Sequence, residues 1–259
     1  MTTVLITGAS AGIGAAFARA LAARKYDLVL VARSEGQLKA IAQQLAAQHD
    51  IQAHVITQDL TESNAAEAVA AAVAAKGLTV DWLINNAGFG RYGEFAQVDR
   101  QTHLQMVQLN VMALVDLTHQ FLPAMLQQQS GCIINVSSTA AFQPIPYMSI
   151  YAATKAFVLS FSEALWAENQ DKGIKVLAVC PGPTRTQFAD RANFPDSMAE
   201  RMGQNYDSSE EVVKDALKAL KQGQSTVVTG SFSNKVVAAL PRLLPRQNVV
   251  KLVGQLFEP

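Results

Sequence analysis

The sequence has little cysteine and no surplus of charge. Its 259 residues include only two cysteines, Cys132 and Cys180, and neither lies in a CxxC motif or beside a histidine pair, so no metal site is expected. We predict two buried, reduced thiols, which suit a cytoplasmic protein. The 21 basic residues balance the 21 acidic ones. This balance removes the usual argument for binding nucleic acid, which depends on an excess of positive charge.

Long uninterrupted apolar runs are also missing. The stretch between Asp116 and Lys155 holds no charged residue, yet Pro123, Gly131 and Pro144 interrupt it, so no window of about 20 residues reads as a transmembrane helix. The N-terminus has no basic region before its first apolar run, and a secretory signal is therefore not expected. With 49% apolar and 16% charged residues, the chain is predicted to be globular rather than disordered.

Short apolar runs alternate along the chain with longer segments of helical periodicity. Seven runs are nearly continuously apolar, as strands covered on both faces must be; they span residues 4–7, 27–32, 51–57, 80–85, 132–137, 174–180 and 225–229. Helices are predicted near residues 13–24, 35–48, 62–75, 101–128, 149–171 and 209–221. Strict alternation predicts a doubly wound, three-layer α/β fold of the Rossmann type, with a parallel sheet and a single domain over residues 1–259.

Two later segments depart from this alternation. In residues 184–208 a few large apolar residues, including Phe188 and Phe194, lie among polar ones, which indicates either a substrate flap or a surface excursion without a function. Residues 231–259 carry apolar stripes interleaved with basic residues and are predicted to form one or two amphipathic helices. Such helices cover a core or a partner subunit more often than a membrane.

A glycine-rich turn follows the first predicted strand. Gly8, Gly12 and Gly14 stand in the sequence TGASAGIG, and a helix is expected to begin near Ile13. Glycines allow a tight turn and a close backbone approach to a pyrophosphate, which the amide groups and the positive dipole end of the helix would hold. The context of strand, glycine loop and helix therefore predicts a dinucleotide site, although the spacing differs from GxGxxG.

Two other motif matches are interpreted as coincidental. A literal GxGxxG occurs at Gly88, Gly90 and Gly93, but no helix start follows it directly. The loop also matches the GxSxG elbow of serine hydrolases, with Ser10 as nucleophile. That rival function lacks an oxyanion loop from an earlier strand and a downstream histidine, because all four histidines occur in the first half of the chain: His49, His54, His103 and His119.

The residue after the second strand indicates which dinucleotide is used. An acidic residue there would hydrogen-bond the ribose hydroxyls of NAD, whereas this chain has Arg33. An arginine can pair with a 2′-phosphate through a fork of donors, and an acid would repel it. NADP is therefore the predicted cofactor.

Tyr151 and Lys155 are the strongest candidates for acid/base chemistry. They are four residues apart at the start of a predicted helix, so both project from one face. A free tyrosine has a pKa of about 10, and about 4 kcal/mol is needed to lower it to neutrality. A neighbouring ammonium and an oxidised nicotinamide would supply part of that.

These motifs together resemble those of the short-chain dehydrogenase/reductase family. The resemblance extends from the first strand to about residue 190 and rests on TGASAGIG, the Asn85-Asn86-Ala87-Gly88 segment, Ser138, the YxxxK pair and Pro181-Gly182, in this order. It implies that Ser138 hydrogen-bonds the substrate carbonyl and that Tyr151 donates the proton. It also implies that Lys155 lowers the pKa of Tyr151 and holds the nicotinamide ribose, and that Asn110 holds a water in a proton relay.

The resemblance also assigns the cofactor site. It places Asp59 and Leu60 at the adenine, and Pro181, Gly182, Thr184 and Thr186 at the nicotinamide end. The full set of expected cofactor contacts is Gly8, Ser10, Gly12, Ile13, Gly14, Arg33, Asp59, Leu60, Asn86, Ala87, Gly88, Tyr151, Lys155, Pro181, Gly182, Thr184 and Thr186. Many NADP-preferring members have a basic residue where this chain has Ala11, so recognition of the phosphate is expected to depend mainly on Arg33.

The sequence thus predicts an NADP(H)-dependent oxidoreductase acting on a ketone, an aldehyde or a secondary alcohol. The alternative is a catalytically idle NADP-binding sensor or scaffold. A hydrophobic substrate is expected, because apolar residues cluster in the segments that would line the pocket: Phe89, Tyr92, Phe142, Pro144, Tyr147, Met148 and Phe188. The family suggests a homodimer or homotetramer formed through the helices near 101–128 and 149–171.

Overall fold

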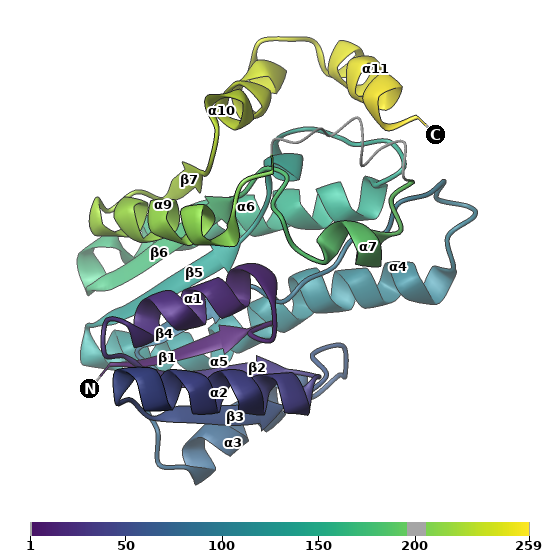
Figure 1. Ribbon diagram of the computed structural model, residues 1–259. Helices are drawn as coiled ribbons and strands as arrows, with labels where there is room; N and C mark the ends of the chain where they lie inside the picture. Colours follow the sequence, from purple (N-terminus) through teal and green to yellow (C-terminus); the bar gives the residue numbers. More distant parts are fainter. Residues whose placement is uncertain (1, 196–205, 259) are drawn as a thin grey trace.

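The computed structural model describes residues 2–195 and 206–258 and contains a seven-stranded parallel sheet (Figure 1). The strand order is β3-β2-β1-β4-β5-β6-β7. The strands are β1 (Thr3–Thr7), β2 (Asp27–Ala32), β3 (Ala53–Thr57), β4 (Trp82–Asn85), β5 (Gly131–Val136), β6 (Ile174–Cys180) and β7 (Thr226–Val228). All seven predicted strands are present, and the doubly wound α/β class is confirmed.

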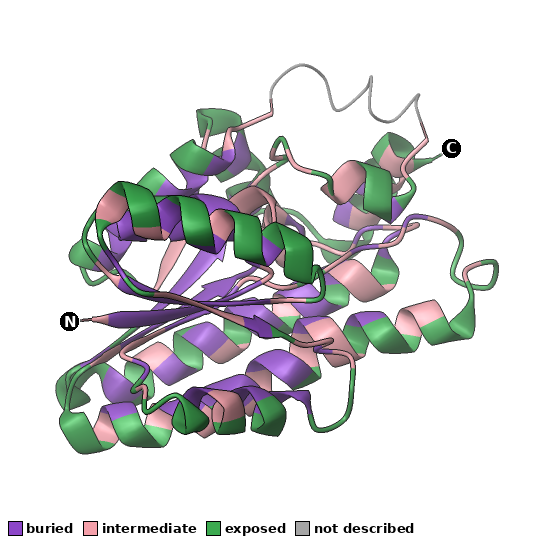
Figure 2. Cartoon of the chain, turned by 60° about the horizontal axis from the view of Figure 1, so that its bottom comes forward, coloured by how far each residue is buried: buried purple, intermediate pink, exposed green. Residues whose placement is uncertain are grey.

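Helices cover both faces of the sheet. One face packs against α1 (Gly12–Ala22), α2 (Glu35–His49) and α9 (Ser209–Lys221), and the other against α3 (Ala65–Ala75), α5 (Ala113–Gln128) and α6 (Ser149–Asn169). Successive strand residues serve opposite faces, so Val4 and Ile6 lie in the first core cluster and Leu5 in the second. Figure 2 shows the sheet as a buried layer between helices whose outer sides are exposed. The continuous apolar runs in the sequence therefore reflect burial on both faces.

The predicted helix near 101–128 is interrupted by a turn of π-helix. It consists of α4 (Arg100–Val107), the π-turn η1 (Gln108–Met112) and α5. Within the described residues, Arg100–Gln128 is one helix long and apolar enough to cross a membrane by length and composition, with a mean hydropathy of 1.2. Leu117, Phe121 and Met125 of this helix lie in the core. Packing against the sheet thus accounts for the apolar composition of its second half.

The two segments that depart from the alternation of strands and helices, 184–208 and 231–259, have described parts at the carboxyl edge of the sheet. Residues 184–195 contain the short helix α7 (Phe188–Ala192), and residues 196–205 of the expected flap lie outside the described residues. The tail forms α10 (Phe232–Ala239), the short 3₁₀ turn η4 (Leu240–Arg242) and α11 (Arg246–Phe257). Figure 1 shows α10 and α11 beyond β7, at one end of the molecule. The tail, for which one or two helices were expected, thus contains α10 and α11.

The order in which strands are added to the sheet changes direction at the pair β1 and β4. Strands β2 and β3 extend the sheet on one side of β1, and β4 to β7 extend it on the other. The loops after β1 and β4 therefore leave neighbouring strands at the same edge, which is where open α/β sheets bind ligands.

Candidate active site

The loop after β1 and the loop after β4 are joined by hydrogen bonds. The Thr7 hydroxyl accepts from the amides of Asn86 and Ala87, each at 3.0 Å, and the Asn86 side-chain amide donates to the Thr7 carbonyl at 2.9 Å. Gly8 has a φ of 64°, and a Cβ on it would lie 2.8 Å from Asn86 Nδ2. Asn86 thus fixes the loop that precedes α1.

The N-terminus of α1 fits a pyrophosphate. No side chain in the described parts of the chain caps this helix, and its first turn contains no acidic residue. A Cβ on Gly14 would overlap the Gly8 carbonyl oxygen, so the loop is compact only with glycine there. Free amide groups and the helix dipole at such a terminus attract anions. Gly8, Gly12, Ile13 and Gly14 therefore lie where a dinucleotide phosphate would bind.

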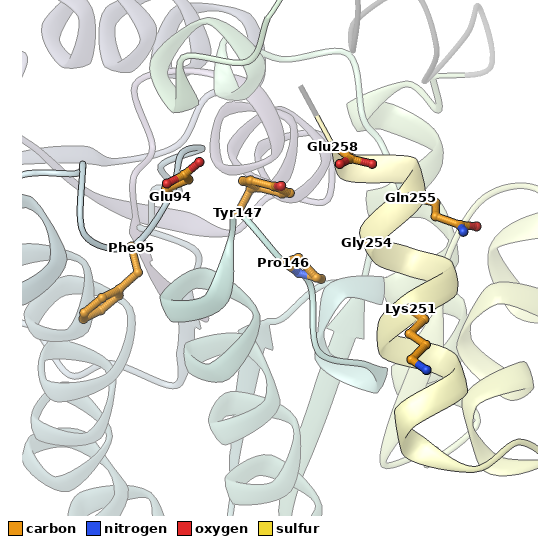
Figure 3. Close-up of a pocket in the computed structure, with 8 residues that line it drawn as sticks. All are labelled: Glu94, Phe95, Pro146, Tyr147, Lys251, Gly254, Gln255 and Glu258. Atoms are coloured by element: carbon orange, nitrogen blue, oxygen red, sulfur yellow. The ribbon is translucent and has the colours of Figure 1, made fainter.

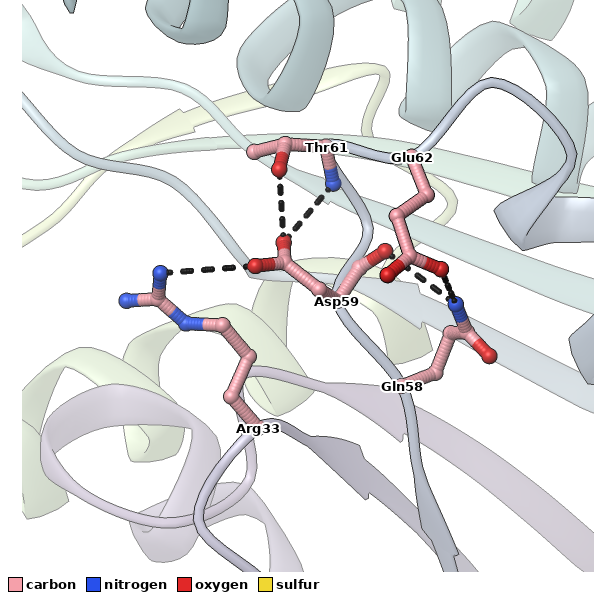
Figure 4. Close-up of polar contacts among 5 residues, drawn as sticks. All are labelled: Arg33, Gln58, Asp59, Thr61 and Glu62. Atoms are coloured by element: carbon pink, nitrogen blue, oxygen red, sulfur yellow. Dashed lines mark hydrogen bonds and ion pairs between the residues drawn. The ribbon is translucent and has the colours of Figure 1, made fainter.

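Arg33 and Asp59 face each other at the carboxyl ends of β2 and β3 (Figure 4). Arg33 Nη1 lies 3.7 Å from Asp59 Oδ2, and 69% of the Arg33 side chain is exposed, so the guanidinium is accessible to a phosphate. Burial acts to raise the pKa of Asp59. Hydrogen bonds from Thr61 and the charge of Arg33 outweigh it, and the pKa is lowered overall. Asp59 is thus ionised at neutral pH and competes for Arg33.

Ser138, Tyr151 and Lys155 come together beyond the carboxyl end of β5. Ser138 follows the strand and caps the short 3₁₀ turn η2 (Thr139–Phe142), and its hydroxyl accepts from the Ala140 amide at 3.1 Å. Tyr151 and Lys155 lie on the first turns of α6, with Lys155 Nζ 5.8 Å from the Tyr151 ring centroid. Lys155 Nζ also donates to the Val136 carbonyl at 2.8 Å. The predicted catalytic set therefore forms one site.

Burial shifts the pKa values of both Tyr151 and Lys155. Burial raises the pKa of Tyr151 to about 12, and hydrogen bonding with Ser138 only partly opposes this. Burial lowers the pKa of Lys155 to about 8. Burial dominates both values, and the expected lowering of the Tyr151 pKa by Lys155 together with an oxidised nicotinamide stays a prediction. A phenol of this kind is protonated at neutral pH.

Asn110 connects the loop after β4 with α6. It is buried in the π-turn, its Oδ1 accepts from the Phe89 amide at 3.1 Å, and its Nδ2 donates to the Phe89 carbonyl and to Thr154 Oγ1. A Cβ on Gly88 would lie 3.0 Å from Asn110 Oδ1 and 3.4 Å from Lys155 Nζ. The segment at Gly88 thus lies directly against Asn110 and Lys155, and its contact with a cofactor stays a prediction.

The segment after β6 closes the other side of the site. The Pro181 carbonyl accepts from the Thr139 amide at 2.9 Å, and the Thr184 hydroxyl donates to the Gly182 carbonyl at 2.9 Å. A Cβ on Gly12 would lie 3.0 Å from Thr186 Cγ2, so this segment reaches the glycine loop. Thr186, one of the expected cofactor contacts, therefore lies near the predicted phosphate site. Leu60 is buried in the core, and it offers little side-chain surface to an adenine.

An apolar cluster lies beside Tyr151. The Phe188 ring centroid is 5.1 Å from that of Tyr151. The cluster includes several predicted pocket residues and also the C-terminal helix: Tyr92, Tyr147, Met148, Phe188, Phe194, Val249, Val253 and Phe257. Phe142 packs elsewhere, against the Leu159 cluster. The Tyr92 hydroxyl donates to the Phe257 carbonyl at 2.7 Å, which ties α11 to the loop after β4.

A surface cavity of about 550 Å³ adjoins this cluster (Figure 3). Three parts of the chain form its walls: the segment after β4, the turn that precedes α6, and the C-terminal region that contains α11. The lining residues are Glu94, Phe95, Pro146, Tyr147, Lys251, Gly254, Gln255 and Glu258. None of the candidate catalytic side chains lines it. The cavity is thus a neighbour of the site and not the position of the chemistry.

The two motifs interpreted as coincidental do not form the sites they suggest. A Cβ on Gly90 would lie 2.7 Å from Phe188 Cζ and 3.2 Å from Tyr151 Cδ2, which places the GxGxxG segment against the apolar cluster. None of the four histidines, all within the described residues, hydrogen-bonds to Ser10. His103, for example, contacts the Phe95 carbonyl instead. No serine hydrolase arrangement is present in the described part of the chain.

The sequence reasoning missed three residues that hold the site together. Thr7 joins two loops, Ser137 Oγ donates to the Lys155 carbonyl at 2.7 Å, and Thr154 Oγ1 accepts from Asn110 while donating to the Tyr151 carbonyl. Each neighbours a residue that was predicted. The sequence could not identify them, because their roles depend on hydrogen bonds to residues far away in the chain or to the backbone.

Comparison with known proteins assigns the family. A family model described as "short chain dehydrogenase" matches residues 2–196. The chain belongs to the short-chain dehydrogenase/reductase family. It is similar to the very-long-chain 3-oxoacyl-CoA reductase of Mus musculus, with 29% identity over 254 residues that cover 96% of this chain and 77% of the relative. As a family member the protein is an oxidoreductase of the type that uses a nicotinamide cofactor.

Two solved structures, the first of them a short-chain dehydrogenase, share the fold over nearly the whole chain. One, from Sphingobium yanoikuyae, is in complex with NADPH, has a TM-score of 0.84 and 34% identity, and aligns over 96% of this chain and 95% of its own. The other is a "bulky-bulky ketone specific" alcohol dehydrogenase from Comamonas testosteroni, with a TM-score of 0.80 and 32% identity over 96% and 93% of the two chains. Both alignments include the C-terminal region beyond the family model.

Proposed function

We propose that the protein transfers a hydride between NADP(H) and a ketone or aldehyde, or the corresponding alcohol. The observation that carries this proposal is the convergence of Ser138, Tyr151 and Lys155 at the edge where the glycine loop and the Gly88 segment meet. Bound NADPH supplies the hydride to the carbonyl carbon. The residues of the chain bind the carbonyl oxygen and deliver the proton to it.

Each catalytic side chain has a separate part. Ser138 donates a hydrogen bond to the carbonyl oxygen, and Tyr151 donates both a hydrogen bond and then the proton as negative charge grows there. A pKa raised to about 12 keeps Tyr151 protonated, so it is prepared for reduction. Lys155 contributes positive charge near the phenol, and Asn110 holds the Gly88–Phe89 segment against α6. A water relay through Asn110 remains a prediction.

The preference for NADP is supported by Arg33. Its guanidinium is exposed beyond β2, where the 2′-phosphate of a dinucleotide on the glycine loop would lie, and a similar solved structure contains NADPH. Asp59 counters this charge at 3.7 Å, and Ala11 offers no second cation. We therefore propose a moderate rather than a strict preference.

The apolar cluster at Tyr151 supports a hydrophobic substrate. Phe188 and Met148 lie against the position of Gly90, beside the Tyr151 ring. The names of two similar proteins, a very-long-chain 3-oxoacyl-CoA reductase and a bulky-ketone alcohol dehydrogenase, are consistent with large apolar substrates. Buried, unpaired Cys132 and Cys180 also support the proposal of a cytoplasmic enzyme.

NADPH oxidation with a panel of aliphatic and aromatic ketones tests the proposal. Tyr151→Phe should lower kcat at least about 10³-fold, since it removes the proton donor, while the Kd for NADPH stays within about twofold. Tyr26→Phe is the matched control, because Tyr26 packs against Trp82 and not against the site. A catalytically idle sensor would bind NADPH, but neither the wild type nor Tyr151→Phe would reduce any carbonyl compound.

A further inference from the structure

The outer side of α10 carries a row of exposed apolar side chains. Phe232 is 79% exposed, Val236 45% and Leu240 40%, and their spacing of four residues places them on one side of the helix. Leu243, in the turn that follows, is 80% exposed. We call these four residues the C-terminal stripe. A row of this kind on one helix is unlike the scattered apolar residues of an ordinary surface.

The rotation of α10 is fixed, so the C-terminal stripe cannot turn inward. Asn234 and Ala238 lie on the opposite side of the helix and are buried. The Asn234 amide donates to Asp207 Oδ2 at 2.8 Å and to the Thr229 carbonyl at 3.0 Å. These bonds hold the inner side of α10 against the segment after β6.

Basic residues accompany the C-terminal stripe. The segment 231–259 contains four of the 21 basic residues and one of the 21 acidic residues, so it carries a formal charge of +3 while the rest of the chain carries −3. Lys235, Arg246 and Lys251 of this segment are exposed. Leu252 and Leu256 of α11 add further exposed apolar surface. Although the total charge is zero, the C-terminal end of the molecule is therefore basic and apolar.

We propose that the C-terminal stripe docks the protein peripherally on an anionic lipid surface. Aromatic and leucine side chains enter the boundary between headgroups and acyl chains, and lysine and arginine pair with anionic headgroups. A second copy of this chain fits less well, since a two-fold contact would bring two segments of charge +3 together. The charge therefore selects a lipid surface over self-association.

Vesicle flotation of the full chain tests the docking. We expect it to float with vesicles that contain phosphatidylglycerol, to float much less with phosphatidylcholine alone, and to lose binding as salt is raised. The double variant Phe232→Ser/Leu243→Ser should reduce the partition coefficient at least about tenfold. Lys235→Glu and Arg246→Glu should each reduce it about fivefold or more.

Control variants remove side chains of the same kind elsewhere. Phe95→Ser deletes an exposed apolar residue of the loop after β4, and Lys172→Glu reverses an exposed charge before β6; both should float as the wild type does. Thermal unfolding midpoints should be unchanged in the stripe variants, because the substituted side chains are exposed. The proposal is overturned if the wild type stays with the soluble fraction, or if the double variant floats equally well. It is also overturned if the double variant halves the mass in sedimentation, which would make a second copy the occupant.

Discussion

Arg33 carries the discrimination between NADP and NAD in the proposed reaction. Its guanidinium would form charge-assisted hydrogen bonds to the 2′-phosphate, and such bonds are worth about 1.5–3 kcal/mol each. Arg33→Ala should therefore raise the Kd for NADPH about 10- to 100-fold and change that for NADH by about twofold or less. Fluorescence titration of both cofactors measures the two constants. Arg24→Ala, an exposed arginine just after α1, serves as the control, and equal losses for both cofactors would reject the phosphate contact.

Half-buried Tyr151 and buried Lys155 set the expected pH dependence of the reaction. A Tyr151 pKa of about 12 and a Lys155 pKa of about 8 leave both groups protonated below pH 8. The rate of ketone reduction should therefore be independent of pH below about pH 8 and should fall above it, because Lys155 loses its proton there. Alcohol oxidation needs the phenolate and should rise with pH across the neutral range. Initial rates in both directions check this.

The variant Lys155→Arg tests whether deprotonation of Lys155 causes the predicted loss of reductase activity above about pH 8. Lys155→Arg replaces a titrating ammonium with a guanidinium, which stays charged throughout this range. Whatever reductase activity remains should be level through pH 8 to 10. An unchanged fall near pH 8 would mean that another group titrates.

At the scale of elements, the apolar pattern predicted the seven strands but not all of their bounds. Strands β2 and β6 begin and end where expected, whereas the run 51–57 includes two residues that precede β3. The π-turn at Gln108–Met112 could not be predicted, because it adds one residue to a turn without altering helical composition. It places Asn110 under the Gly88 segment. The catalytic motifs were thus visible in the sequence, and the geometry that joins them was not.

Helix α9 has a complete N-terminal cap that supports the segment after β6. The Ser208 hydroxyl accepts from the Glu211 amide at 3.1 Å, and Glu211 Oε2 accepts from the Ser208 amide at 3.0 Å. Ser208→Ala should lower the free energy of unfolding by about 1 kcal/mol, and Tm by about 2–4 °C for a chain of this size. Calorimetry measures both. Ser208→Asp should recover most of the loss, and Ser231→Ala, whose side chain caps nothing, should have little effect.

For the whole molecule, two exposed apolar surfaces formed by described residues differ in chemistry and call for different partners. The C-terminal stripe is flanked by lysine and arginine. The second surface combines the exposed sides of α4, the π-turn and α6, and its large members are Leu104, Val107, Met112 and Phe157. The π-turn and α6 pack against each other, so these residues belong to adjacent helices. The stretch from residue 101 to 115 contains no Asp, Glu, Lys or Arg.

Because its α4 and π-turn part carries no charged residue between 101 and 115, this surface can pair with its own copy at little electrostatic cost, and we predict a homodimer through it. Phe157 stacks on Phe161 at 5.9 Å and is still 42% exposed, as expected of an interface anchor. Met112→Glu/Phe157→Glu should convert the dimer to a monomer, because a two-fold contact would bring four carboxylates into one apolar patch. Light scattering after size exclusion measures the mass. Phe232→Ser/Leu243→Ser should leave the dimer intact. If Met112→Glu/Phe157→Glu remains a dimer and Phe232→Ser/Leu243→Ser becomes a monomer, the C-terminal stripe is the dimer interface and the proposed assignment of the two surfaces is wrong.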